Sequence, residues 1–270
     1  MQWDQRDSGK TYLLNDPQKL GSHDDSCANG SGCRGGDQLA AQRVWQEQVL
    51  PSSSLGRQLC GPAYGGTSSR LSLPYIGVGE MADIPESERR GWRFVMDAAR
   101  RTRNAQAVQD LDAIAPYFAP GHPSPSEDVF IERKWISAFG GTMAFRDGSK
   151  ADTDVGQLSP DNTEAEISHL WDGNNFNEKY LLEEFLSHDW SVPELDWPVI
   201  ISAGRHDYIA NSRVVAEWFT RFKAPSKQFV WFENSGNMPM TEELGKFLLS
   251  LLQFARPIAE RAGDTAPDAP

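Results

Sequence analysis

The sequence after Pro198 alternates apolar runs with amphipathic runs, and this alternation limits the fold more than any other feature. "VIISAG" at 199–204 is apolar throughout, as in a strand buried on both faces, and "QFVWFE" at 228–233 is a second strand-like run. Helical periodicity follows each run, at 211–222 and 241–255. Strand, helix, strand and helix in this order predict a parallel sheet with crossover helices, which is an α/β fold.

The loops after the two predicted strands are the expected place for functional side chains. In open parallel sheets, ligands bind outside the carboxyl ends of the strands. Here those loops are Gly204–Ala210 and Asn234–Met240. Asn211 or Ser212 is suited to cap the helix after the first loop, and Thr241 is suited to cap the helix after the second.

The earlier part of the sequence is less uniform. Residues 21–74 are rich in Gly, Ser, Gln and Cys and follow neither helical nor strand periodicity, so we expect loop or disorder there. Tyr75 opens a short apolar run, "YIGVG", which predicts a strand. Pro- and Gly-rich loops then separate four amphipathic helical patterns, at 86–104, 105–118, 127–140 and 177–190. These patterns predict a helical block ahead of the last two strands.

Composition excludes several classes of protein. The net charge of −12 is opposite to the basic face that nucleic-acid binding requires. No run reaches the roughly 18 apolar residues of a membrane helix and no signal peptide opens the sequence, so we expect a cytoplasmic protein without a membrane partner. Cys27, Cys33 and Cys60 suit neither an even disulfide framework nor a zinc site. We therefore expect free thiols, no metal and no cofactor.

Four segments together resemble one known family. They are "WDQRDSGKT" at 3–11, "YIGVGEMAD" at 75–83, "GRHDY" at 204–208 and "WFENSGNMP" at 231–239. In order and spacing they are similar to the proline iminopeptidases, serine aminopeptidases of the α/β-hydrolase superfamily. The resemblance implies a mostly parallel sheet with an inserted helical cap. It also implies that the last two strand-end loops hold the acid and the histidine of a Ser, Asp, His triad.

The triad that this resemblance implies is incomplete. Asp207 occupies the acid position, but Asn237 stands where the family has histidine, and asparagine can neither take nor return a proton. The nucleophile stays unknown, because no Gly-x-Ser-x-Gly elbow occurs and the nearest serines, Ser68 and Ser69, follow no apolar strand. The family's oxyanion loop precedes the "DQR" strand, so we expect that loop to be missing. His206, which adjoins Asp207, is a candidate for a displaced base, but neighbouring loop side chains usually diverge, so it is interpreted as an ordinary loop histidine.

The expected architecture is an incomplete, N-terminally truncated α/β-hydrolase fold. Its irregular segment is interpreted as disordered or frame-shifted sequence without a strand, which would leave the edge of the "YIGVG" strand exposed. The expected parts are a remnant of a core strand and loop (1–20), the irregular segment (21–74), a core strand (75–82), the helical cap (83–195), a C-terminal α/β core (196–257) and a disordered tail (258–270).

Three functions fit these observations. The first is a degenerate hydrolase, related to enzymes that cleave an N-terminal aminoacyl amide or a small ester, with little or no turnover. The second is a working hydrolase or accessory enzyme whose catalytic residues the sequence does not reveal. The third is a non-catalytic protein that binds a small molecule or peptide at the tryptophan-rich helical cap. We favour the first, a pseudoenzyme, because base, nucleophile and oxyanion loop are all unrecognisable.

Overall fold

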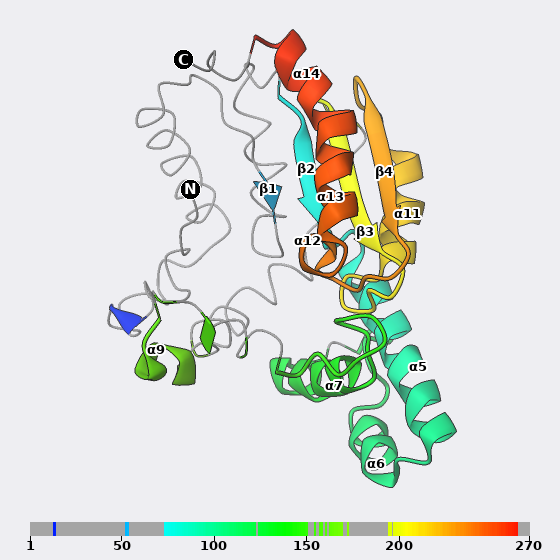
Figure 1. The fold of residues 1–270 in the computed structure, drawn as a ribbon. Coiled ribbons are helices and arrows are strands. Elements are labelled where there is room, and N and C mark those ends of the chain that lie inside the picture. The colour runs from blue at the N-terminus through cyan, green and yellow to red at the C-terminus, as the bar shows by residue number, and fades with distance from the viewer. Residues whose placement is uncertain are drawn as a thin grey trace.

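The computed structural model contains a parallel β-sheet with helices on both faces and a group of helices beyond one end of the sheet (Figure 1). It describes residues 13–14, 52–53, 73–122, 124–150, 154, 157–158, 160, 162–169, 172, 194–195 and 197–263. The helix predicted at 177–190 lies outside these residues, as do Ser68 and Ser69.

The described sheet is built from four parallel strands. They are β1 (Ser52–Ser53), β2 (Tyr75–Val78), β3 (Val199–Gly204) and β4 (Lys227–Phe232), in the spatial order β1-β2-β3-β4. β3 pairs with β2 on one side and β4 on the other, and all of its residues are buried. The apolar run therefore forms the doubly covered strand that the sequence predicts.

The strand β1 corrects two expectations. We expected no strand within residues 21–74 and an exposed edge on β2, but β1 lies parallel to β2, with Ser52 opposite Ile76. Ile76 is buried. A strand with buried side chains also needs partners for its outer backbone groups, and β1 supplies them for part of β2. Most of the segment 21–74 lies outside the described residues.

Helical elements follow β3 and β4. They are α11 (Ser212–Arg221), α12 (Pro239–Glu242), α13 (Leu244–Ser250), the π-helical turn η2 (Leu251–Ala255) and α14 (Arg256–Arg261). Figure 1 shows α11 and α13 on opposite sides of the sheet.

Side chains of β3 alternate between these two sides. Val199 and Ile201 pack with Val215 of α11 in one apolar cluster. Ile200, between them in sequence, packs on the other face in a second cluster with Ala255 of η2. This period of two is the geometry of a strand. Because both faces of β3 are covered, successive side chains of the run are apolar, and Ser202 is the one polar side chain among them.

The predicted helix at 241–255 is broken near its start. Its first turn begins at Pro239, a residue that favours the first helical position. The backbone leaves helical geometry at Glu243, where φ is −128°, and then resumes as α13. Thr241 is not the cap, because it lies inside α12 and its hydroxyl donates to the carbonyl of Met238 at 2.9 Å. At this break the side chain of Glu243 accepts hydrogen bonds from Asn234 and Ser235 of the preceding loop.

Two further element ends differ from expectation. Asn211 is the cap residue of α11, as predicted, but its φ is 52° and its side chain makes no capping hydrogen bond. The tail 258–270 was predicted to be disordered, but its first residues are helical, because α14 continues to Arg261. Burial of Ala259 supports this extra turn.

The helical block begins directly after β2. Its described helices are α5 (Ile84–Thr102), α6 (Ala105–Ala113), α7 (Ser126–Ala138) and the short α9 (Glu164–Ser168). The first three confirm the predicted patterns. Asp83 caps α5, and Val95, Leu111 and Ile136 from the three helices share one apolar core. None of the described helices combines the length and the apolar character that crossing a bilayer requires.

Candidate functional site

The carboxyl ends of β2, β3 and β4 meet at one edge of the sheet, as parallel strands require. We call the loops Gly204–Ala210 and Asn234–Met238, together with Gly79 after β2, the strand-end corner. Gly79 has a φ of +61°, and a Cβ atom there would lie 2.7 Å from Nδ2 of Asn237. A Cβ atom on Gly204 would overlap the backbone of the loop after β4. Glycine at these two positions therefore lets the three strand ends approach closely.

Asp207 is the buried acid of the strand-end corner, with an exposed fraction of 3%. Its Oδ1 accepts hydrogen bonds from the backbone amides of Ile209 and Ala210, both at 3.0 Å. Its Oδ2 accepts a hydrogen bond from Nδ2 of Asn237, also at 3.0 Å. Burial raises the pKa of Asp207 to about 6, while these donors and the charge of Arg133 oppose the rise. At pH 7 the carboxylate form therefore predominates.

Asn237 is held from its side chain and from its backbone. Its side-chain amide donates to Asp207, and its backbone amide donates to the carbonyl of Thr142 at 2.8 Å. Toward the carboxylate it presents an N–H group, as the histidine of a triad would, but it has no nitrogen that can accept a proton. The structure thus brings together Asp207 and Asn237, the two site residues predicted from the sequence. They form a pair of an acid and an amide, where a triad has an acid and a base.

Two consecutive carboxylates hold the loop after β4. Oε2 of Glu242 accepts a hydrogen bond from the backbone amide of Gly236 at 2.7 Å. Oε2 of Glu243 accepts from the backbone amide of Asn234 at 2.9 Å and from the hydroxyl of Ser235 at 2.7 Å. This role is not predictable from the sequence, because no local pattern distinguishes a helix carboxylate that turns back to a loop from one that faces solvent.

The turn after α7 ties the helical block to the corner. The backbone amide of Ala144 donates to Oε1 of Glu242 at 2.8 Å, so that one buried carboxylate joins two segments. The backbone amide of Tyr208 donates to the carbonyl of Gly141 at 2.9 Å. The ring of Tyr208 also stacks on Phe94 of α5, with 3.6 Å between ring centroids. The geometry of the corner therefore depends on both parts of the molecule.

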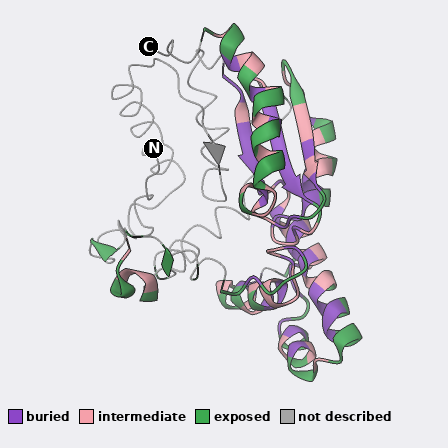
Figure 2. Ribbon diagram, in the orientation of Figure 1, coloured by how far each residue is buried: buried purple, intermediate pink, exposed green. Residues whose placement is uncertain are grey.

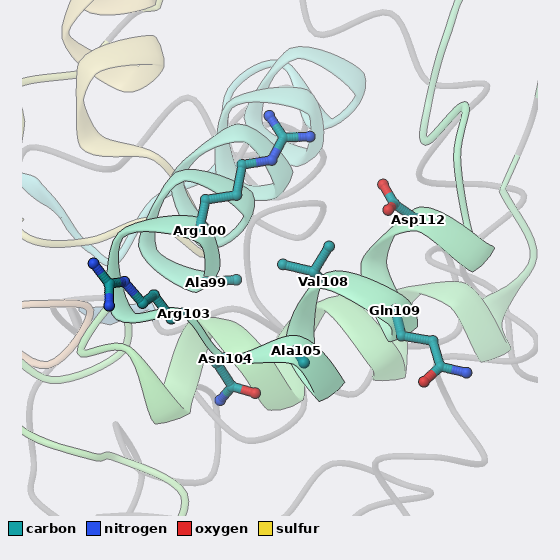
Figure 3. A pocket seen from close by; sticks show the side chains of 8 residues that line it. All are labelled: Ala99, Arg100, Arg103, Asn104, Ala105, Val108, Gln109 and Asp112. Carbon is teal, nitrogen blue, oxygen red and sulfur yellow. The ribbon is translucent and has the colours of Figure 1, made fainter.

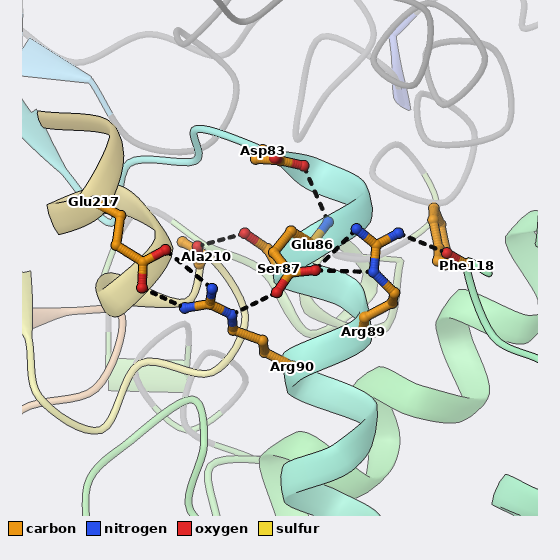
Figure 4. Close-up of polar contacts among 8 residues, drawn as sticks. All are labelled: Asp83, Glu86, Ser87, Arg89, Arg90, Phe118, Ala210 and Glu217. Carbon is orange, nitrogen blue, oxygen red and sulfur yellow. Dashed lines mark hydrogen bonds and ion pairs between the residues drawn. The ribbon is translucent and has the colours of Figure 1, made fainter. Parts of the chain in front are cut away.

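Helix α5 also binds the loop after β3 and the helix that follows it (Figure 4). The hydroxyl of Ser87 donates to the carbonyl of Ala210 at 3.0 Å. Arg90 donates to both carboxylate oxygens of Glu217 in α11, at 2.8 and 3.0 Å, and to Glu86 at 2.8 Å. The Glu217 carboxylate, followed by that of Glu86, holds the pKa of Arg90 above its usual range. These contacts fix the orientation of α5 against the sheet.

A second group of buried charges lies inside the helical block. Arg133 donates to Glu132 at 2.7 Å and to Glu88, and the hydroxyl of Tyr117 donates to Glu88 at 2.6 Å. We call these four residues the buried charge cluster. Burial acts to lower the pKa of Arg133, but Glu88 and Glu132 outweigh it and hold that pKa well above its usual range. The same guanidinium favours the ionised form of Asp207.

The other candidates from the sequence do not complete a triad within the described structure. The ring of His206 packs against Phe145, with 4.3 Å between ring centroids, while Asn237 is the residue that bonds Asp207. Among the described residues, no three His, Cys, Asp or Glu side chains are arranged to hold a metal ion. In the described part of the chain, the strand-end corner therefore offers hydrogen bonding and one carboxylate, and no proton-transfer pair.

A shallow groove of about 610 Å³ lies between the end of α5 and the start of α6 (Figure 3). Its lining residues are Ala99, Arg100, Arg103, Asn104, Ala105, Val108, Gln109 and Asp112. None of them is aromatic, so this groove does not support the third function, a ligand site at the tryptophan-rich helical cap. A ligand at the cap stays a prediction.

Comparison with known proteins places the fold. No protein-family model matches the sequence. The proline iminopeptidase of Mycobacterium smegmatis has a TM-score of 0.55 and 14% identity, over 91% of this chain and 76% of that chain. VinJ has a TM-score of 0.52 and 14% identity, over 90% of this chain and 76% of that chain. Both are α/β-hydrolases, and the chain has the α/β-hydrolase fold, which confirms the predicted fold class.

One curated relative matches a shorter segment. The probable aminopeptidase YbaC of Bacillus subtilis (strain 168) is 31% identical over 86 residues, which are 31% of this chain and 27% of that protein. The match thus spans about a quarter of the length of the relative.

Proposed function

We propose that this chain is an aminopeptidase-type α/β-hydrolase homologue that no longer turns over its substrate class, the amides or small esters of N-terminal aminoacyl groups. The amides in this substrate class follow the names of two similar proteins, the proline iminopeptidase of known structure and the probable aminopeptidase YbaC. The observation that carries the loss of turnover is the hydrogen bond of 3.0 Å from Nδ2 of Asn237 to Oδ2 of Asp207.

The chemistry of that bond supports the proposal. In a serine hydrolase, the acid orients a base that removes the hydroxyl proton and returns it to the leaving group. The amide of Asn237 satisfies Asp207 as a donor, but it cannot carry a proton between nucleophile and leaving group. The loss of one triad member alone removes many orders of magnitude of rate. An asparagine bonded to the acid is thus sufficient to suppress acyl transfer.

The test is hydrolysis of prolyl and alanyl arylamides by the full chain. We expect rates equal to those of a buffer blank between pH 6 and 8. A rate that Asp207→Ala abolishes would contradict the proposal, because it would show a working acid.

A fluorophosphonate label followed by peptide mapping separates the proposal from the second function that the sequence allows. The label reacts with activated serines, so we expect no labelled peptide. A labelled serine would identify a nucleophile and would show that the chain is a hydrolase with another base.

A further inference from the structure

The two carboxylate oxygens of Asp207 have partners of different kinds. Asp207 follows β3, whose residues are all buried (Figure 2), and is itself buried. Its Oδ1 accepts from the backbone amides of Ile209 and Ala210, which belong to the same loop. Its Oδ2 accepts from the side chain of Asn237. A backbone amide can only donate, whereas the side chain of asparagine carries a donor at one end and an acceptor at the other.

This difference decides which oxygen of Asp207 takes up a proton. A proton on Oδ1 would face two N–H donors that the loop holds in place. A proton on Oδ2 leaves both of these bonds intact, but the new O–H group then faces the N–H group of Asn237. Two donors that face each other leave a buried hydrogen without an acceptor, which is costly. The neutral form is accessible nonetheless, because burial raises the pKa of Asp207 to about 6.

Asn237 can present either end of its side-chain amide to Asp207. Half a turn about the bond between Cβ and Cγ exchanges Nδ2 with Oδ1, and both orientations are ordinary ones for asparagine. Among the described residues, Asp207 is the hydrogen-bond partner of this side chain, so the rotation breaks no other bond. A Cβ atom on Gly79 would lie 2.7 Å from Nδ2. Glycine at that position therefore leaves room beside the amide.

We propose that Asn237 reverses its side-chain amide when Asp207 takes up a proton. The proton comes from water and forms an O–H bond at Oδ2. The hydrogen bond from Nδ2 to Oδ2 breaks, and the new O–H group donates to Oδ1 of Asn237. On its other side, Asn237 then presents an NH₂ group where it had presented a carbonyl oxygen. The reversal requires no nucleophile and no turnover, so it does not depend on the proposed function.

The charged side chains around Asp207 have partners of their own. They are Arg133, Glu88 and Glu132 of the buried charge cluster, Glu242 of α12 and Glu80 after β2. The charge of Arg133 favours the ionised form of Asp207. His206 adjoins Asp207, but its ring packs against Phe145. Because histidines as a class change charge near neutral pH, the test has to separate His206 from Asp207.

Nuclear magnetic resonance of the full chain, labelled with ¹⁵N-asparagine and ¹³C-aspartate, tests the proposal between pH 4.5 and 8. At pH 8 we expect one NH₂ proton of Asn237 to lie downfield and to exchange slowly with water, because it is bonded to a carboxylate. As the pH falls, this signal should move upfield and its exchange should accelerate by at least about tenfold. The midpoint should equal that of the carboxyl carbon of Asp207. Asn104, whose Oδ1 accepts from Ala107 at 3.0 Å, is the control and should not respond.

Two variants sharpen the test. In Asp207→Asn, the substituted side chain keeps an oxygen for the two backbone amides and presents an N–H group to Asn237. We therefore expect Asn237 of this variant to give the low-pH signal of the wild type at every pH. His206→Gln should leave the midpoint unchanged, and a transition that this variant removes would overturn the proposal. An Asn237 signal that stays constant while Asp207 titrates, or an Asp207 carboxyl that does not titrate in this range, would overturn it as well.

Discussion

The strand-end corner and the buried charge cluster both bury carboxylates, but they stabilise them in different ways. Asp207 has three neutral donors, two backbone amides and the amide of Asn237. Glu88 and Glu132 share a guanidinium, that of Arg133. Neutral donors only partly oppose the effect of burial, which raises the pKa of a buried acid. A guanidinium instead supplies a full opposite charge to the carboxylates. The carboxyl of Asp207, with a pKa of about 6, can therefore change its protonation near neutral pH, whereas the glutamates of the cluster are held by an opposite charge.

Breaking the buried charge cluster should have the largest effect. Arg133→Met leaves two buried carboxylates without their cation, and we expect the free energy of unfolding to fall by about 3–5 kcal/mol. Urea unfolding at pH 7 measures it. Arg256→Met is the control, since its exposed pair with Glu260 should be worth at most about 1 kcal/mol. Equal losses in the two variants would mean that the cluster is not a structural element.

The pH dependence of the corner is the next effect in size. The pKa of Asp207 is raised from 3.8 to about 6 in the folded protein, so the folded chain keeps a proton that the unfolded chain releases. The stability that Asp207 contributes is therefore present below pH 4 and is lost as the pH rises through 6, by up to about 3 kcal/mol.

Urea unfolding of the wild type and Asp207→Asn between pH 4 and 7 checks this sign. As the pH rises, the unfolding free energy of the wild type should fall relative to that of the variant. Asp97→Asn, at an exposed position of α5, serves as the control. Parallel pH profiles for wild type and Asp207→Asn would contradict a raised pKa of Asp207 in the folded protein.

The carboxylates that support the corner should have a smaller effect. Glu242→Ala leaves the backbone amides of Gly236 and Ala144 without their acceptor, and we expect a loss of about 2 kcal/mol. Hydrogen exchange of these two amides should become faster. Glu243→Ala, which removes the acceptor of the exposed Asn234 amide and of the buried Ser235 hydroxyl, is the comparison; it should cost a similar amount but leave exchange at Ala144 unchanged. No change in exchange at Ala144 would show that Glu242 does not join the helical block to the corner.

The smallest expected effect is on turnover. Asn237→His restores an imidazole beside Asp207, yet we expect hydrolysis of prolyl and alanyl arylamides to stay at the level of a buffer blank, because no nucleophile is recognisable. The double variant with Asp207→Ala is the control. Activity in the single variant that the double variant loses would show that the corner lacked only its base.

Much of the fold could be predicted from local patterns. The run at 199–204 became β3, and the periodic segments after Val78 became α5, α6 and α7, because side-chain periodicity directly reflects which face of an element is buried. The strand β1 was not predicted, because two serines carry no strand signal. These residues form a strand by pairing with β2.

The sequence by itself determined that Asp207 and Asn237 lie on adjacent loops, because parallel strands bring their carboxyl ends to one edge. Only the tertiary structure decided that Asn237 donates to Asp207, that burial raises the pKa of this acid, and that Glu242 joins two segments. It also decided that Arg133 pairs with Glu88, 45 residues away in the sequence. Periodicity is set by the nearest few residues, whereas burial and hydrogen-bond partners are set by whichever distant segments pack together.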